Sequence, residues 1–213
     1  MAETPKPSAK VELRALFSTP IAFAILPDAE SLNSALRTTI LAREKSHPST
    51  GHSNLGGWQS TWDIAEWGGG EVRTILAFAR QFADKMTVDR QGQPAPQNWR
   101  MNAWANVNRL GHGNEFHTHP GCVWSASYYV DDGGIADDPS LGGQFEIQDP
   151  RGVAPAMFRP DLVPNVPNGA SFGASEIISP TAGTLLMFPS WLSHAVRPYT
   201  GGGSRISIAM NFS

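Results

Sequence analysis

Apolar residues recur with two periods along the chain, and the change of period separates a helical first part from a strand-rich second part. The first predicted helix runs from Asp28, a suitable N-cap residue, to about Lys45. Its apolar face consists of Leu32, Ala35, Leu36 and Ile40. The second predicted helix runs from Glu71 to Lys85. Its apolar face consists of Ile75, Phe78, Ala79 and Phe82.

From about residue 98 onward, short apolar or alternating runs are separated by Gly, Pro and Asp. The runs are Asn98–Asn108, Glu115–His119, Val123–Val130, Gly143–Gln148, Glu176–Ser179, Gly183–Phe188 and Arg205–Phe212. Short strands at this spacing are typical of a sandwich or barrel. We therefore predict a mainly β protein with flanking α-helices, built as a double-stranded β-helix, or jelly roll.

The length and composition predict one domain over residues 1–213. We expect residues 1–10 to be a loose tail, 11–97 a helical support region and 98–213 the jelly-roll core. Residues 152–174 are rich in Pro, Asn and Gly, so they are a candidate loop over a site.

Charge and cysteine content narrow the functional classes. The formal net charge of −3 argues against a nucleic-acid partner, which usually requires a basic surplus. The single cysteine, Cys122, allows no intrachain disulfide and favours a reducing cytoplasm. No apolar stretch reaches the roughly 18 residues of a membrane helix, so no membrane association is predicted. The sequence does not determine the oligomeric state.

Histidine placement is the strongest chemical signal. His117 and His119 lie two residues apart, and on a strand such residues point to the same face. His194 follows a later strand-like run, which a jelly roll can return beside an earlier strand. An isolated His is usually structural or solvated, but three together could hold a metal and leave positions open for substrate and O2.

A candidate anion-binding residue follows the histidines. Arg205 and Ser207 share one face of an alternating run. An inward-facing Arg is costly unless it meets an anion, and its guanidinium matches a carboxylate. Taken alone, an Arg on a surface strand with a salt-bridge partner would be the better interpretation.

Four segments together resemble a known family. They are His117-Thr-His-Pro-Gly, Ser125-Ala-Ser-Tyr-Tyr-Val, Phe188-Pro-Ser-Trp-Leu-Ser-His194 and Arg205-Ile-Ser-Ile-Ala-Met-Asn-Phe. This set resembles the small bacterial and phage 2OG-Fe(II) oxygenases, which are related to the prolyl-4-hydroxylases. The resemblance extends weakly to Leu16-Phe-Ser-Thr-Pro and Gly56-Gly-Trp-Gln-Ser, so it covers most of the chain. Each segment alone is weakly specific, whereas the combination is specific.

The resemblance implies an Fe(II)- and 2-oxoglutarate-dependent dioxygenase. Such an enzyme uses O2 to hydroxylate a substrate, here an unidentified protein side chain or small molecule, and releases succinate and CO2. His117 and His194 match the iron-binding histidines. The far carboxylate of 2-oxoglutarate is assigned to Arg205. The further cosubstrate contacts that the resemblance implies are Ser207, Tyr129 and, as a neighbouring position, Asn106.

One position departs from the wider superfamily. The second residue after the first ligand is usually Asp, and here it is His119. Three neutral imidazoles would leave the iron centre more positive than two imidazoles and a carboxylate. The alternative is that a carboxylate from Glu115, Glu146 or Asp149 completes the metal site.

Two rival functions remain open at this point. The first is a cupin-like dioxygenase that does not use 2-oxoglutarate, since Gly111 precedes the His pair as in a cupin motif. The cupin motif then requires a Glu where Val123 and Trp124 stand, and His194 is too far from Gly183 for its second part. The second rival is a non-catalytic jelly-roll module with a structural metal, although such sites are usually closed and often contain Cys.

Overall fold

The computed structural model describes residues 12–13, 16–27, 29–153, 157, 159–163, 165 and 173–213. The expected tail at residues 1–10, the N-cap at Asp28 and much of the expected loop at 152–174 therefore lie outside the described residues. The elements are β1 (Ala22–Ile25), α1 (Ala29–Ser46), β2 (Asn54–Leu55), β3 (Trp58–Gln59), α2 (Ile64–Trp67), α3 (Gly69–Met86), β4 (Met101–Asn108), β5 (Gly113–His117), β6 (Trp124–Asp131), η1 (Pro139–Leu141), β7 (Phe145–Gln148), β8 (Ser175–Ile178), β9 (Thr184–Pro189), β10 (His194–Val196) and β11 (Arg205–Phe212).

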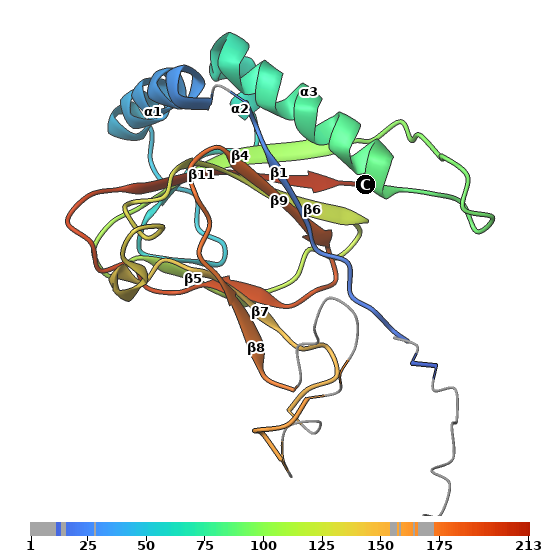
Figure 1. Cartoon of the computed structure of the whole chain (residues 1–213). Helices are drawn as coiled ribbons and strands as arrows, with labels where there is room; N and C mark the ends of the chain where they lie inside the picture. The colour runs from blue at the N-terminus through green and yellow to red at the C-terminus, as the bar shows by residue number, and fades with distance from the viewer. Residues whose placement is uncertain are drawn as a thin grey trace, which may run out of the picture.

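The strands form two antiparallel sheets that face each other. The larger sheet has six strands in the order β1-β9-β6-β11-β4-β3, and the smaller has five in the order β2-β5-β10-β7-β8. Helices α1 and α3 lie across the outer face of the larger sheet, while β5, β7 and β8 belong to the layer on its other side (Figure 1). The non-consecutive strand orders bring residues far apart in sequence together between the two sheets.

Alternation along the central strand β11 explains why its sheet is buried on both faces. Its even-numbered residues join the main core beneath the helices, and they are Ile206, Ile208, Met210 and Phe212. The helices contribute apolar side chains to the same core, including Leu36, Ile40, Ile75 and Ala79. The odd-numbered residues of β11 point to the opposite face, between the sheets, because successive side chains in a strand alternate.

The space between the sheets is only partly apolar. A second, smaller cluster there consists of Tyr129, Phe145, Ile147, Leu186, Phe188 and Leu192. The remaining inward-facing positions of β4, β6 and β11 are mostly polar. This polar strip is where a ligand can be held between the two layers.

The two long helices and the main strands agree with the sequence prediction to within a few residues. The strands β1, β2, β3 and β10 and the four-residue helix α2 were not predicted, because elements this short carry too little periodicity to detect. Residues 12–97 therefore supply three strands in addition to the helices.

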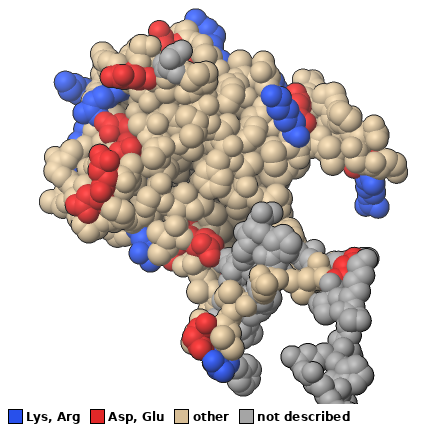
Figure 2. All heavy atoms as spheres, viewed as in Figure 1, with Lys and Arg blue, Asp and Glu red and all other residues tan. Residues whose placement is uncertain are grey.

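Charged residues do not cluster by sign on the visible surface. On the face in Figure 2, acidic and basic side chains lie mainly toward the edges, and the centre is uncharged. None of the described helices combines the length and the apolar character that a membrane-crossing helix requires.

Candidate metal centre and adjoining pocket

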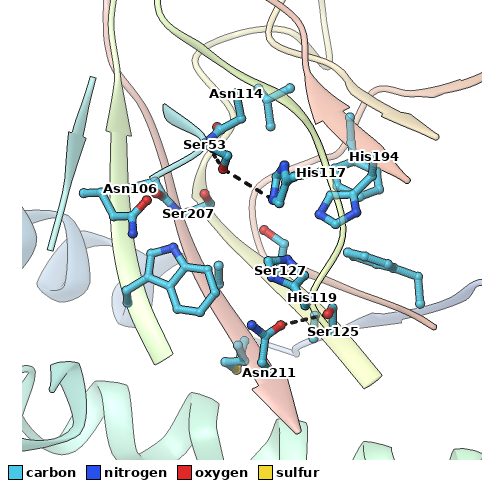
Figure 3. A pocket seen from close by; sticks show the side chains of 18 of the residues that line it. Ser53, Asn106, Asn114, His117, His119, Ser125, Ser127, His194, Ser207 and Asn211 are labelled. Atoms are coloured by element: carbon cyan, nitrogen blue, oxygen red, sulfur yellow. Dashed lines mark hydrogen bonds between the residues drawn. The ribbon is translucent and has the colours of Figure 1, made fainter. Parts of the chain in front are cut away.

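Three histidines that are distant in sequence meet between the sheets. Strands β5 and β10 pair so that His194 lies opposite His117, and His119 approaches from the turn after β5. One ring nitrogen from each of the three lies within 4.8 Å of the others. The ring centroids are 4.3 Å apart for His117 and His194, and 4.9 Å for His117 and His119. Figure 3 shows the three imidazoles gathered on one side of the pocket.

The strand argument for His119 was wrong in one respect. Strand β5 ends at His117, so His119 lies in the following turn and does not share a strand face with it. Two backbone hydrogen bonds fix this turn instead. The His119 amide donates to the carbonyl of Ser190 over 2.9 Å, and the Cys122 amide donates to the carbonyl of His119 over 3.3 Å. The loop before β10 therefore positions His119.

Backbone carbonyls orient two of the three rings. Nδ1 of His117 lies 2.7 Å from the carbonyl oxygen of Glu115, and Nδ1 of His194 lies 2.8 Å from that of Leu192. A carbonyl can only accept, so each Nδ1 carries the proton and each Nε2 keeps its lone pair. Hydrogen bonding of this kind fixes the tautomer of metal-binding histidines. The hydroxyl of Ser53 is 3.4 Å from Nε2 of His117 (Figure 3).

All three imidazoles are held in the neutral form. Burial lowers the pKa of His117, and burial together with the neighbouring His117 lowers the pKa of His119 to about 4. For His194, which is 4% exposed, burial and the two other rings lower the pKa to about 3. Neutral rings at physiological pH have lone pairs available for a metal ion.

No carboxylate joins this cluster within the described part of the chain. Glu115 is exposed. Glu146 forms an ion pair with Arg197 and accepts a hydrogen bond from Ser175. Asp149 is engaged by its own neighbour Arg151 and by the backbone of Gly173. The alternative ligand set with a carboxylate in place of His119 has no support in the geometry.

Arg205 lies at the other end of the same pocket. It is 2% exposed, and its guanidinium carbon stands 5.2 Å from the centre of the Tyr129 ring. Within the described residues, neither Nε of Arg205 nor the hydroxyl of Tyr129 has a hydrogen-bond partner. Burial lowers the pKa of Arg205 and raises that of Tyr129. Buried polar atoms without partners are costly, which points to a ligand that supplies acceptors here.

Sheet pairing places the other predicted residues beside Arg205. Ser207 lies opposite Asn106 on β4 and opposite Tyr129 on β6, so the three form one row across the sheet. All of them line the pocket that contains the three histidines. In Figure 3, Asn106 and Ser207 stand across the pocket from the imidazoles. The structure thus brings together all seven residues that the sequence singled out.

Several pocket residues were not predicted. The polar ones on β6 and β11 that follow the same alternation are Ser125, Ser127 and Asn211. The strand alternation could have identified Asn211, because it lies on the same face of β11 as Arg205 and Ser207. Ser53 and Gln59 carried no such signal, because they come from short segments around β2 and β3. Three tryptophans next to these segments differ in their surroundings, since Trp104 lines the pocket, Trp124 is in the core and Trp191 is exposed.

The residues present fit a divalent metal and a dicarboxylate. Three neutral imidazoles converge at one end. At the other end lies a buried guanidinium whose Nε has no hydrogen-bond partner among the described residues. The polar row between them can hydrogen-bond to a bound anion. Phe145 and Phe188 pack against His194 at ring-centroid distances of 5.2 and 4.6 Å, which makes one side of the metal position apolar.

Comparison with known families gives one match. The family model described as "Putative 2OG-Fe(II) oxygenase" matches residues 102–211, which is about half of the chain and includes all seven site residues. No curated protein matches this sequence.

Solved structures share the fold. A prolyl-4-hydroxylase from Pseudomonas putida aligns with a TM-score of 0.64 and 19% identity over 92% of both chains. A prolyl hydroxylase from Trichoplax adhaerens, in complex with a hypoxia inducible factor peptide fragment, aligns with a TM-score of 0.61 and 16% identity, covering 89% of this chain and 82% of that one. HygX from Streptomyces hygroscopicus, with nickel and 2-oxoglutarate bound, gives 0.60 and 13%, covering 92% and 83%. The predicted double-stranded β-helix is confirmed.

Proposed function

We propose that this chain, which belongs to the 2OG-Fe(II) oxygenase family, holds its Fe(II) with His117, His119 and His194 and its 2-oxoglutarate with Arg205. The bound iron and cosubstrate supply the chemistry, in which O2 is consumed, 2-oxoglutarate is converted to succinate and CO2, and a substrate C–H bond is hydroxylated. The observation that carries the residue assignment is the buried guanidinium of Arg205, whose Nε has no hydrogen-bond partner among the described residues, in the same pocket as the three imidazoles.

Each site residue has a distinct part in this proposal. The carbonyls of Glu115 and Leu192 hold two imidazoles in the tautomer that presents Nε2. Arg205 pairs with the far carboxylate of 2-oxoglutarate, since a guanidinium can bind a carboxylate through two parallel hydrogen bonds. The hydroxyl of Tyr129, which is fully buried, donates to the same carboxylate.

Ser207 and Asn106 border the path between Arg205 and the metal. Their register opposite each other places a hydroxyl and an amide in the same row of the sheet. We assign them to hydrogen bonds that keep the cosubstrate extended across the pocket. Because both residues are at least nine-tenths buried, such bonds would exclude water from the cosubstrate.

The family match favours this function over the two rivals. A cupin-like dioxygenase has no use for a buried Arg in the pocket next to its metal site. A structural metal site is usually closed, whereas this one opens into a pocket. The lone Cys122 supports a reducing compartment, and we place the enzyme in the cytoplasm as part of the proposal. The prolyl hydroxylases among the similar structures make a protein side chain one possible class of substrate, and a small molecule is the other.

The test is an anaerobic titration of metal-free protein with Fe(II) and then 2-oxoglutarate. Chelation of the keto acid by Fe(II) gives a visible charge-transfer band, which we expect in the wild type and not in His194→Ala. The control is His47→Ala, which removes an exposed imidazole that does not belong to the histidine cluster and should leave the band intact. Iron binding without the band in the wild type would refute the proposal and favour a cupin-like or structural site.

A further inference from the structure

A second cavity opens beside the metal position. It has a volume of about 400 Å³ and adjoins the pocket described above. The residues that line both spaces are Ser53, Gln59, Trp104, His117, His119 and Asn211. Cavities of this size accommodate small organic molecules. A molecule seated in this cavity would lie against two of the three imidazoles, which is where a substrate must present its reacting carbon.

The lining of this cavity is free of full charges. Among the described residues that border it there is no Asp, Glu, Lys or Arg. When bound 2-oxoglutarate balances the charge of the metal, a charged ligand would lose its hydration there without gaining a partner of opposite charge, which is costly. The cavity selects against free amino acids, phosphorylated compounds and carboxylates.

Aromatic rings form two of its walls. Trp62 is 54% exposed and stacks on His52, with ring centroids 4.9 Å apart and planes inclined by 24°. Trp104, on β4, lies edge-on to His119 at 6.0 Å. The stacking holds the Trp62 ring in place although about half of its surface is exposed. A rigid, accessible aromatic face of this kind binds the apolar face of a ring with little loss of conformational entropy.

Side-chain amides supply the polar contacts. Asn211 accepts a hydrogen bond from the hydroxyl of Ser125 over 2.7 Å, so its oxygen is occupied and its NH2 group remains free to donate (Figure 3). Gln59 is 3% exposed, and its side chain makes no hydrogen bond to any described residue. Asn102 borders the same space. Amides can both donate and accept, which matches hydroxyl groups, since these also do both.

The strand edge at this cavity is already covered. The backbone amide of Gln59, on β3, donates to the hydroxyl of Ser49 over 3.0 Å, and its carbonyl accepts from the amide of Thr50 over 2.9 Å. An extended peptide that binds by adding a strand needs these groups free. Recognition here must therefore rely on side chains.

We propose that this cavity binds an uncharged, hydroxyl-bearing ring compound, of the polyol or glycoside class, as the substrate of the oxygenase. The ring stacks on Trp62, and its hydroxyls bond to Gln59 and Asn211. This inference rests on the proposed function for its claim that the ligand is a substrate, whereas the binding preference itself follows from the cavity alone.

The experiment is ligand-observed saturation-transfer NMR on protein loaded with Zn(II) and 2-oxoglutarate. Zn(II) is diamagnetic and redox-inert, and the 2-oxoglutarate dianion balances its charge. The probes are a panel of neutral methyl pyranosides, their uronate and amino-sugar counterparts, and N-acetyl-prolinamide. We expect at least one neutral pyranoside to bind and its charged counterparts to bind at least tenfold more weakly. Trp62→Ala should weaken the neutral probe at least tenfold. Trp191→Ala is the matched control, because Trp191 is equally exposed at 56% and does not border the cavity, and it should have no effect.

Four outcomes overturn the inference. They are binding of charged sugars equal to that of neutral ones, equal losses in Trp62→Ala and Trp191→Ala, binding of the prolinamide in preference to every sugar, and binding of no sugar at all. The anaerobic Fe(II) titration separates this inference from the proposed function. If the charge-transfer band is absent while a neutral sugar still binds through Trp62, the oxygenase assignment fails and the binding preference stands. If the band is present but no sugar binds, only the preference fails.

Discussion

Replacement of Arg205 by Met tests whether the guanidinium is present for a ligand or for the fold. The side chain is 2% exposed, and its Nε has no hydrogen-bond partner within the described residues. Met has a similar length and no charge, so Arg205→Met removes the buried charge with little change in packing. If Arg205 serves a ligand, the ligand-free protein bears a cost that the variant relieves.

The two interpretations predict opposite signs for the change in stability. Replacing a buried charged group by an apolar one of similar volume is often neutral or stabilising, so we expect the free energy of unfolding of the ligand-free variant to be unchanged or about 1–3 kcal/mol higher. Breaking a well-paired buried charge instead costs about 3–5 kcal/mol. Loss of the charge pair with 2-oxoglutarate should cost about 2–5 kcal/mol of binding free energy. At about 1.4 kcal/mol per tenfold, this weakens 2-oxoglutarate binding roughly 30-fold to a few thousand-fold.

The assay combines urea unfolding of the metal-free proteins with calorimetric titration of 2-oxoglutarate into anaerobic Fe(II)-loaded protein. Arg197→Met is the matched control. Arg197 is 44% exposed and pairs with Glu146, so its loss should change stability by less than about 1 kcal/mol and leave 2-oxoglutarate affinity unaltered. A destabilisation of Arg205→Met by 3 kcal/mol or more, with unchanged 2-oxoglutarate affinity, would refute the reasoning and make Arg205 a structural residue.

Three further predictions concern the metal ligands and one tight turn. His119→Asp should retain Fe(II) but bind 2-oxoglutarate roughly fivefold or more weakly by calorimetry. The reason is that a negative charge about 4 Å away costs about 1 kcal/mol in water and up to about 4 kcal/mol near a protein surface. Tighter binding would contradict the electrostatic argument. Gly142→Ala should lower the free energy of unfolding in urea by more than about 2 kcal/mol, since the φ of Gly142 is +70° and a Cβ would lie 2.1 Å from the carbonyl oxygen of Pro198. The control, Gly92→Ala, should lower it by only about 1 kcal/mol, because Gly92 has a φ of +78° but open space around it. The metal-free protein should lose stability as pH falls below about 6.5, because histidines whose pKa is lowered in the folded state bind fewer protons there than in the unfolded state. The unfolding free energy should fall by at most about 1.4 kcal/mol per pH unit for each histidine. Equal unfolding free energies at pH 7 and pH 5 would contradict the prediction.

The candidate site was largely predictable because strand alternation is a local property. Arg205 and Ser207 lie on the same face of a strand regardless of how that strand packs, and Asn211 lies on this face as well. The order of apolar and polar residues on β11 thus separates a core face from a pocket face. The short strands β2 and β3 were missed, and with them Ser53 and Gln59, because two residues have no detectable period.

Other features depended on long-range pairing. Nothing local indicates that the three-residue strand β10 pairs with β5, yet this pairing is what places His194 opposite His117. The position of His119 depends on a hydrogen bond to Ser190, which lies 71 residues further along the chain (190 − 119). The tertiary structure also decides which carboxylates are available as metal ligands. Glu146 is not available, because it forms an ion pair with Arg197 from another strand region.

The sequence by itself therefore determined the types of the chemical groups, their faces on the longer strands and the helices that cover one sheet, because each follows from the period of the chain. The tertiary structure alone decided that three imidazoles converge, that Arg205 is buried with its Nε unpaired among the described residues, and that Trp62 and Asn211 border a cavity without charged side chains. The physical reason is that these features depend on contacts between segments tens of residues apart. Their register is set by the packing of two whole sheets, and local periodicity does not encode it.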